Sequence, residues 1–440
     1  MGIASQFAGD IGEGRFDRAL AAVYPDTYRE ERPRLADLAG ELGRRFGGDH
    51  IHMFSAPGRT ELGGNHTDHN AGRVLAASVS LDTVAAVSAR EDDRVEIVSE
   101  GYEDLIRVDL GVLEPDEQEH GRTEALIRGV AAYLQATGYV AGGFSAVITS
   151  RVGSGSGLSS SAAFEVLIAE IFSVLYNGGR LSTLELALAG RHAENRFFGK
   201  PSGLMDQIAC ASGGVVAIDF RNEDEPQVER IPVSFQDHGY QLFAVDSGED
   251  HADLTDDYAA IVTEMAAVAR PLGADRLREV DYEEFRRRIP ELRAAAGDRA
   301  VLRAFHFFQE NERVLRQSRM LTDGDLDGFL AEVGESGRSS WRFLQNCYSP
   351  GTPRRQGIAV ALALSEEFLE RPDLFAHPPR IEGATRVHGG GFAGTIQTYV
   401  PMARAGAYRE TMAAVLGPAA VTELTVRETG VCRLFDSGTD

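Results

Sequence analysis

The chain is poor in lysine and in cysteine. Of its 44 basic residues only Lys200 is a lysine, and 67 acidic residues give a formal net charge of −23. Because an acidic surface gains nothing from meeting another polyanion, nucleic acid and anionic membranes are not expected as partners. The three cysteines, Cys210, Cys347 and Cys432, are far apart and lack C-x-x-C spacing. This pattern excludes a disulfide framework and the usual zinc motifs, and it predicts a reducing compartment, the cytoplasm.

Long apolar runs and targeting signals are also missing. No window of about 18 apolar residues is apparent, so we expect no segment that spans a membrane. The first residues lack the basic and apolar regions of a signal peptide, and Gln6 breaks the myristoylation pattern. With 43% hydrophobic and 25% charged residues among 440, the composition is that of a folded protein with two or three domains.

Two common nucleotide motifs are absent or incomplete. No Gly-x-x-x-x-Gly-Lys-Ser/Thr sequence occurs, which excludes a Walker A loop. Residues 389–394 read G-x-G-x-x-G, but residues 395–400 alternate like a strand that Pro401 ends, where a dinucleotide-binding fold needs a helix. We therefore interpret this second glycine cluster as close backbone packing beside a ligand or another loop.

A different phosphate motif is present at residues 152–163, where spaced glycines and three consecutive serines precede an amphipathic segment, 164–176. Glycines let successive N–H groups point at one oxyanion, and the N-terminus of the following helix adds positive potential at the same place. A flexible Gly/Ser linker is the alternative, but a linker would not lead straight into apolar residues at helical spacing. We expect a nucleoside triphosphate to be bound by Gly153, Gly155, Ser156, Gly157, Leu158, Ser159, Ser160 and Ser161.

A dense polar cluster lies at residues 55–70, between apolar strands. Short side chains with fixed donors and acceptors suit a polyhydroxylated ligand, because each sugar hydroxyl left without a partner costs about 1 to 3 kcal/mol. Two alternatives remain. His66, Asp68 and His69 are candidate ligands of a divalent metal ion, although their spacing matches no usual zinc pattern. The cluster is also compatible with a solvated turn.

Two carboxylates in residues 193–207 suggest phosphoryl transfer. Glu194 lies at the end of an expected helix, and Asp206 follows a glycine turn. One carboxylate can hold Mg²⁺ on the nucleotide while the other orients or deprotonates an attacking hydroxyl. Either residue alone would be interpreted as an ordinary surface charge or helix cap. The catalytic interpretation depends on the phosphate loop and the polar cluster that accompany them.

The order of expected elements predicts an α+β fold in two domains. The first 50 residues are expected to be helical, and a charged stretch ending at Pro226 is the best boundary, giving domains 1–226 and 227–440. No internal repeat is visible. Strands are expected at 74–87, 95–108, 143–150, 215–220, 240–245 and 421–426, and helices at 122–137, 258–270, 299–322, 326–347 and 357–369.

In three motifs, their order and their spacing, the sequence resembles the GHMP small-molecule kinases, and within them the galactokinases. Residues 57–70 are similar to the galactokinase signature, whose usual form is G-R-V-N-L-I-G-E-H-T-D-Y-N. Residues 155–163 resemble the phosphate loop of the family, and residues 389–394 its third motif. Residues 203–207 and the 303–306 segment are also similar to galactokinases.

The resemblance implies an N-terminal domain like ribosomal protein S5 domain 2 and a ferredoxin-like C-terminal domain, with ATP and Mg²⁺ in the cleft between them. It implies a kinase that phosphorylates the anomeric 1-hydroxyl of a hexose, D-galactose. Asp206 would be the base or orienting carboxylate, Arg59 would stabilise charge, and Ser160 with Glu194 would hold Mg²⁺. Contacts to the sugar would come from Asn65, His66, Asp68, Gly203 and Tyr258.

The sequence departs from the family at the sugar signature, because Asn65 replaces the glutamate, and Glu61 and His69 replace the neighbouring Asn and Tyr. An amide donates as well as accepts hydrogen bonds, so a 6-carboxylate would be tolerated and galacturonate is an alternative substrate. A superfamily kinase of a non-sugar alcohol and a sensor that binds galactose and ATP without turnover are further alternatives. We expect a monomer or a weak homodimer.

Overall fold

The computed structural model describes residues 2–101, 104–153, 157–200, 202–249, 254–370 and 382–438, with the side chain of Thr255 left out. The strands are β1 (His52–Gly63), β2 (Arg73–Ala89), β3 (Arg94–Ser99), β4 (Ile106–Asp109), β5 (Phe144–Ser150), β6 (Val215–Asp219), β7 (Gln227–Ile231), β8 (Tyr240–Asp246), β9 (Ala384–Val387), β10 (Thr395–Pro401), β11 (Val421–Leu424) and β12 (Cys432–Asp436). The α-helices are α1 (Ile3–Glu13), α2 (Asp17–Val23), α3 (Tyr28–Arg45), α4 (Thr123–Ala136), α5 (Ser160–Asn177), α6 (Thr183–Ala193), α7 (Met205–Ser212), α8 (Thr255–Ala269), α9 (Tyr282–Arg287), α10 (Ile289–Ala296), α11 (Asp298–Asp323), α12 (Leu326–Ser339), α13 (Gly357–Leu369) and α14 (Ala405–Leu416).

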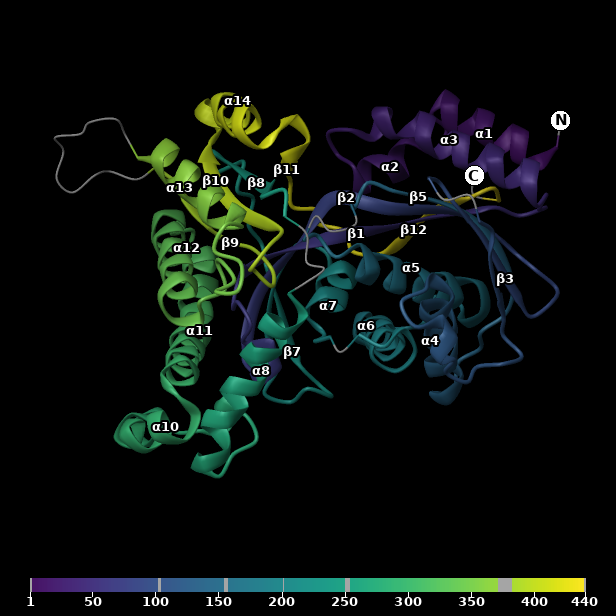
Figure 1. The fold of residues 1–440 in the computed structure, drawn as a ribbon. Coiled ribbons are helices and arrows are strands. Elements are labelled where there is room, and N and C mark those ends of the chain that lie inside the picture. The colour runs from purple at the N-terminus through teal and green to yellow at the C-terminus, as the bar shows by residue number, and fades with distance from the viewer. Residues whose placement is uncertain are drawn as a thin grey trace.

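A large sheet forms the first half of the molecule, in the order β12-β1-β2-β5-β3-β4, with β6 paired to β2 and β7 paired to β6. Alternate side chains of a strand point to opposite faces. Val84 and Ala86 of β2 therefore pack against α1 to α3, while Ala85 and Val87 pack against α4 to α6. Figure 1 shows the N-terminal helices on one face of this sheet and α4 to α6 on the other.

Helix α5 begins directly after the phosphate loop and runs through the core. By length and composition its residues 160–177 are apolar enough to cross a membrane, with a mean hydropathy of 1.2, so the expectation that no such window exists is wrong. However, 61% of the window is buried inside the protein, because its residues pack under the large sheet. Within the described residues, α5 is the only helix that passes this test.

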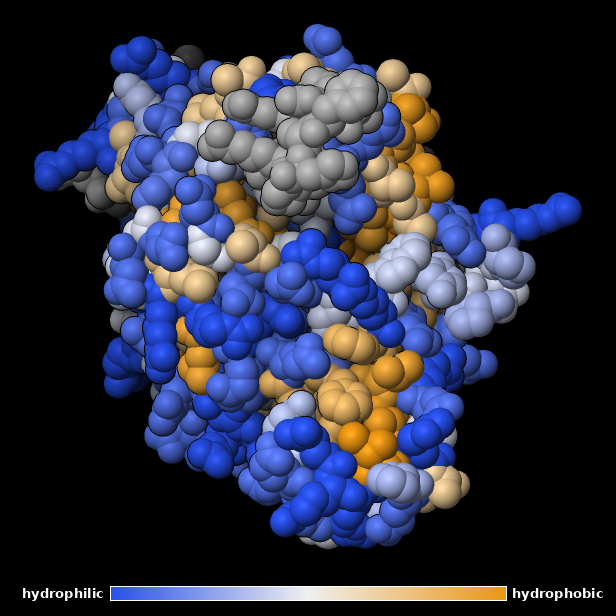
Figure 2. Space-filling model, turned by 90° about the vertical axis from the view of Figure 1, so that its left-hand side faces the viewer, coloured by the Kyte–Doolittle hydropathy of each residue, from blue (hydrophilic) through white to orange (hydrophobic). Residues whose placement is uncertain are grey.

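The smaller sheet has the order β11-β8-β10-β9 and is antiparallel throughout. Helices α13 and α14 cover one of its faces, and a hydrophobic cluster on the other face joins it to α12 and to the large sheet through Leu62 and Leu75. The outer face near α10 to α13 is mostly hydrophilic, with separate hydrophobic patches (Figure 2). The two sheets, each covered by helices, confirm the predicted α+β fold class.

Most expected elements form at the expected places, and two differ. The segment 95–108 contains two strands, β3 and β4, which pair antiparallel. The helix expected at 326–347 is shorter in the structure. Its α-helical part ends at Ser339, and one π-helical turn, Ser340–Leu344, follows. The helical conformation stops at Gln345, which is left-handed with φ of 58°. The division at residue 226 stays a prediction. Two later strands, β7 and β12, pair within the large sheet, so the C-terminus returns to the N-terminal half.

Candidate active site

The phosphate loop lies between β5 and α5 and packs against β1. Gly157 and Ser159 take left-handed conformations with φ of 73° and 57°, which turn the chain into the start of α5. The buried Leu158 carbonyl accepts a hydrogen bond from the Arg59 N–H at 3.0 Å. A Cβ on Gly58 would lie 2.9 Å from that same carbonyl oxygen, so this approach requires a glycine. Among the predicted phosphate ligands, Gly155 and Ser156 lie outside the described residues.

Arg59 and Asp206 form a two-point ion pair beside this loop. Arg59 Nε and Nη2 donate to the two Asp206 carboxylate oxygens at 2.7 and 2.8 Å, and Arg59 Nη1 donates to the Gly157 carbonyl. The Ser159 hydroxyl also donates to Asp206. Burial raises the pKa of Asp206, but the Arg59 charge and these hydrogen bonds outweigh it, so that the pKa lies below its ordinary value. Asp206 is therefore a carboxylate at neutral pH, and 30% of its side chain is exposed.

A second carboxylate group lies next to the first turn of α5. Glu194 begins a π-helical turn after α6 and accepts from the Ser161 hydroxyl at 3.3 Å and from Lys200 Nζ at 2.8 Å. Gln207 donates to Glu194 at 3.0 Å and to Glu165 at 2.9 Å. Burial, followed by the Glu194 charge, raises the pKa of Glu165 well above its ordinary value, which favours the protonated form of this carboxyl group behind Glu194.

The oxygen donors of this group suit a hard divalent cation such as Mg²⁺. Glu194 is 3% exposed and already attracts one cation, the Lys200 ammonium group, whose own side chain is 60% exposed. Ser160, the other predicted ligand, is the first residue of α5, beside Ser161. The residues present therefore fit a Mg²⁺ ion that would take over the position of Lys200 on Glu194.

The loop after β1 brings two of the predicted sugar contacts, His66 and Asp68, toward the glycine segments. Asp68 and Gly203 are in direct contact, because a Cβ on Gly203 would lie 2.3 Å from Asp68 Oδ2. The His66 ring bonds the Gly390 carbonyl at 2.9 Å, and burial lowers the pKa of His66 to about 4. The Tyr258 hydroxyl of α8 donates to the Gly391 carbonyl at 2.6 Å.

Asn65 also contacts the third glycine motif, but its side chain differs from the others in being enclosed. It is fully buried, and its amide donates to Glu61 at 3.1 Å and to the Gly389 carbonyl at 2.6 Å. Its oxygen accepts from Asn346 at 2.9 Å. Glu61 in turn is paired with Arg386 of β9. The Asn65 side chain thus ties the sugar loop to the third glycine motif and to Asn346.

The 303–306 segment is similar to galactokinases in sequence, but no supporting role was predicted for the residues of the second half of the chain that hold the sugar loop. The His388 ring lies 3.0 Å from the Thr60 hydroxyl and 2.9 Å from the Thr395 hydroxyl. His306 bonds the Asn65 carbonyl at 2.9 Å, and Glu310 accepts from the Gly64 N–H at 3.2 Å. One local feature of the sequence indicates that His388 contacts the sugar loop, namely its position directly before Gly389 of the third glycine motif.

The alternative metal site in the sugar loop is not supported. Within the part of the chain that the structure describes, one group of three metal-ligating side chains lies close enough together to hold an ion, and it consists of His50, His52 and Asp436. His66 and His69 are not part of it.

Comparisons with known proteins agree with this geometry. Residues 125–214 match the GHMP kinases N terminal domain family, and residues 42–89 match the galactokinase galactose-binding signature. The first range contains the phosphate loop, Glu194 and Asp206, and the second contains Arg59 and the sugar loop.

Curated relatives and solved structures extend the likeness over most of the chain. The galactokinase of Actinobacillus pleuropneumoniae is 31% identical over 351 residues, which are 79% of this chain and 84% of that protein. The galactokinase of Streptococcus thermophilus is 31% identical over 289 residues, 64% of this chain and 73% of that protein. The crystal structure of Lactococcus lactis galactokinase complexed with galactose superimposes with a TM-score of 0.74 at 22% identity, covering 89% of this chain and 98% of that one.

A mevalonate kinase structure aligns less closely, with a TM-score of 0.57 at 14% identity over 86% of this chain and 99% of that one. The wider kinase fold is therefore shared, whereas identity above 30% over most of the chain is found with galactokinases. The chain belongs to the galactokinase family of GHMP kinases.

Proposed function

We propose that this chain transfers the γ-phosphoryl group of ATP to the anomeric 1-hydroxyl of D-galactose. Family membership makes the chain a sugar kinase that uses ATP. The observation that carries the reaction is the Arg59–Asp206 pair, which lies against the phosphate loop with part of the carboxylate accessible. Galactose is the ligand named for the Lactococcus lactis structure, and the galactose-binding signature matches this chain at residues 42–89.

Asp206 acts on the sugar hydroxyl. As a carboxylate at neutral pH, it accepts a hydrogen bond from the 1-hydroxyl, orients the oxygen toward the phosphorus and takes the proton as the O–P bond forms. A loose phosphoryl-transfer transition state needs little help from a strong base, so a carboxylate with a lowered pKa is sufficient. Arg59 compensates charge between Asp206 and the γ-phosphate.

The phosphates are held by backbone N–H groups of the loop from Gly153 to Ser161 and by the N-terminus of α5. Ser160 and Glu194 would hold Mg²⁺, which would supply neutralising charge on the phosphates. Lys200 contacts Glu194 at the same oxygen as Ser161, so this ammonium group competes for the position of the metal. The net charge of −23 makes such local positive groups necessary for an anionic substrate.

The sugar is held by His66, Asp68, Gly203 and Tyr258. Asn65, the remaining predicted sugar contact, donates its amide to Glu61 and to the Gly389 carbonyl. The galacturonate alternative depended on a free amide at this position, so these contacts favour D-galactose.

Incubation with Mg-ATP and a panel of D-galactose, D-galacturonate, D-glucose and a non-sugar alcohol tests the proposal by release of ADP. Release that depends on D-galactose is the expected result. Release with galacturonate alone would correct the sugar, and galactose binding without release would support the sensor. Because Arg59 contacts both Asp206 and Gly157, the Arg59→Ala variant is expected to abolish release, whereas Arg354→Ala at an exposed loop position leaves it unchanged.

We further propose that the chain is a monomer or a weak homodimer and that the division at residue 226 separates two kinase domains. Light scattering on a size-exclusion column measures the oligomeric state, and a mass of four subunits would contradict the first proposal.

We also propose that the chain works in the cytoplasm. All three cysteines are free thiols, which supports a reducing compartment.

A further inference from the structure

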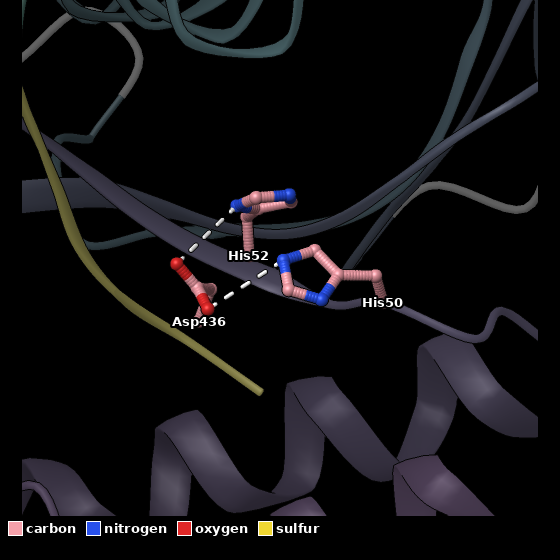
Figure 3. A group of neighbouring side chains, drawn as sticks. All are labelled: His50, His52 and Asp436. Carbon is pink, nitrogen blue, oxygen red and sulfur yellow. Dashed lines mark ion pairs between the residues drawn. The ribbon is translucent and has the colours of Figure 1, made fainter. Parts of the chain in front are cut away.

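Three metal-ligating side chains meet where the C-terminal strand returns to the large sheet (Figure 3). Asp436 ends the edge strand β12 and lies opposite His52, the first residue of β1, and His50 precedes that strand by two residues. His50 Nε2 is 3.5 Å from Asp436 Oδ1, and His52 Nδ1 is 4.0 Å from Oδ2. One ligand atom from each side chain lies within 4.8 Å of the other two.

The donor atoms are suited to a metal ion. His52 Nδ1 is buried and has no hydrogen-bond partner among the residues that the structure describes, and Figure 3 shows it turned toward Asp436. A buried polar atom without a partner costs free energy, which an ion at this position would recover. His50 is about half exposed, so an ion can enter from solvent.

Two further contacts orient the Asp436 carboxylate. The Gly438 N–H donates to Oδ1 at 2.9 Å, and Arg433 Nη1 lies 3.0 Å from Oδ2. A carboxylate oxygen can accept more than one bond, so a metal ion can share these atoms with protein donors. Arg433 is 44% exposed and can turn into solvent when a cation binds.

We propose that His50, His52 and Asp436 bind a first-row divalent transition-metal ion, with Zn²⁺ as the reference ion, and that the ion fastens the C-terminal strand to the sheet. Two imidazoles and one carboxylate are typical ligands of Zn²⁺ and leave a fourth position for water, whereas Mg²⁺ prefers oxygen ligands alone. The site is separate from the kinase centre. His52 and Arg59 are seven residues apart on β1, roughly 23 Å at 3.3 Å per residue.

Titration of the metal-free full chain with ZnCl₂, followed by calorimetry and by thermal unfolding, tests this site. We expect one equivalent of Zn²⁺ to bind and to raise Tm, and an excess of MgCl₂ not to displace it. His50→Asn changes a side chain that is about half exposed, so the variant is expected to fold. Because a ligand is lost, Zn²⁺ should bind more weakly by at least the factor of about 10 to 100 that loss of a hydrogen-bond partner of a ligand costs, and the rise in Tm should disappear. His52→Asn is expected to do the same.

The matched control is His238→Asn, at an exposed histidine whose ring bonds only a backbone carbonyl among its described contacts. It should leave Zn²⁺ binding unchanged, and galactose-dependent ADP release by His50→Asn should equal that of the native chain. Equal Zn²⁺ affinity in the native chain and in His50→Asn, or no binding near one equivalent, would overturn the proposal.

Discussion

Strand β1 carries two charged residues two positions apart, and each pairs with a distant segment in a different environment. Arg59 pairs with Asp206, whose side chain is 30% exposed. Glu61 pairs with Arg386, and the two side chains are 4% and 0% exposed. The first pair borders the phosphate loop, whereas the second lies between β1 and the smaller sheet. An arginine–carboxylate ion pair therefore occurs twice on this strand, once at an accessible position and once in the core.

The two pairs differ in the pKa of the carboxyl group. Burial raises the pKa of both Asp206 and Glu61. For Asp206 the Arg59 charge and three hydrogen bonds outweigh burial, so its pKa lies below the ordinary value, whereas for Glu61 burial dominates despite Arg386 and the pKa lies above it. We infer that the accessible pair serves the reaction and that the buried pair holds the sugar loop against the third glycine motif.

The largest effect is expected from Asp206→Asn. The amide keeps the size of the side chain but cannot take the proton from the sugar hydroxyl, so kcat should fall about 10³-fold with the fold intact. Steady-state assay of ADP release measures the fall, and galactose binding measured by calorimetry should remain. Asp224→Asn, at an exposed acid in the 221–226 loop, is the control. A kcat within tenfold of the native value would remove Asp206 from the reaction.

The buried pair should act on stability instead. Glu61→Gln leaves the Arg386 guanidinium in the core without a counter-charge, which we expect to cost about 3 kcal/mol of unfolding free energy. The exposed Arg409–Glu423 pair provides the matched control, since Glu423→Gln should cost less than about 1 kcal/mol. Urea denaturation compares the two variants. Equal losses would show that burial does not distinguish the pairs.

A smaller effect is expected at Lys200. The Lys200→Gln variant removes the ammonium group that contacts Glu194, so Mg²⁺ no longer competes with it. The Lys200 end of this pair is 60% exposed although Glu194 is buried, so we expect solvent to screen the ammonium group and the pair to be worth about 1 kcal/mol. The Mg²⁺ concentration for half-maximal rate should therefore fall by about fivefold. Titration of the rate with MgCl₂ at saturating ATP checks this. A higher Mg²⁺ requirement would mean that Lys200 assists nucleotide binding.

The smallest change is expected with pH. Because the pKa of Asp206 lies below its ordinary 3.8, the group stays ionised at higher pH, and kcat should not fall between pH 8 and pH 5.5 through this residue. The stability that the ionised group contributes is present above the unfolded pKa and is lost only as the pH falls through the folded value. An acid limb near pH 6.5 in the kcat profile that disappears in Asp206→Asn would contradict the assignment.

The parts of the site that are short and continuous in the sequence could be predicted. The phosphate loop precedes a helix as its apolar spacing indicated, and the resemblance to galactokinases, which the comparisons confirm, named the Arg59 and Asp206 that the fold brings together. The sugar kinase activity and the α+β fold were predicted on the same basis. Short-range periodicity and spacing are sufficient for features of this kind.

The buried side of the sugar loop could not be predicted. Whether Asn65 faces a ligand or the core depends on Glu61, Arg386 and Asn346, and Arg386 lies 325 residues after Glu61. That contact exists only because the smaller sheet packs against the end of β1, which no local pattern records. The contact of Lys200 with Glu194 depends on the intervening π-helical turn in the same way.

The most direct measurement of the central claim is the ³¹P NMR spectrum of a reaction of the native chain with Mg-ATP and D-galactose. The account predicts one new phosphomonoester signal coupled to the anomeric proton of the sugar, and no such signal within the same reaction time when Asp206→Asn is used. A signal coupled to another carbon's proton, or inorganic phosphate alone, would show that the Arg59–Asp206 pair does not direct the anomeric oxygen to ATP.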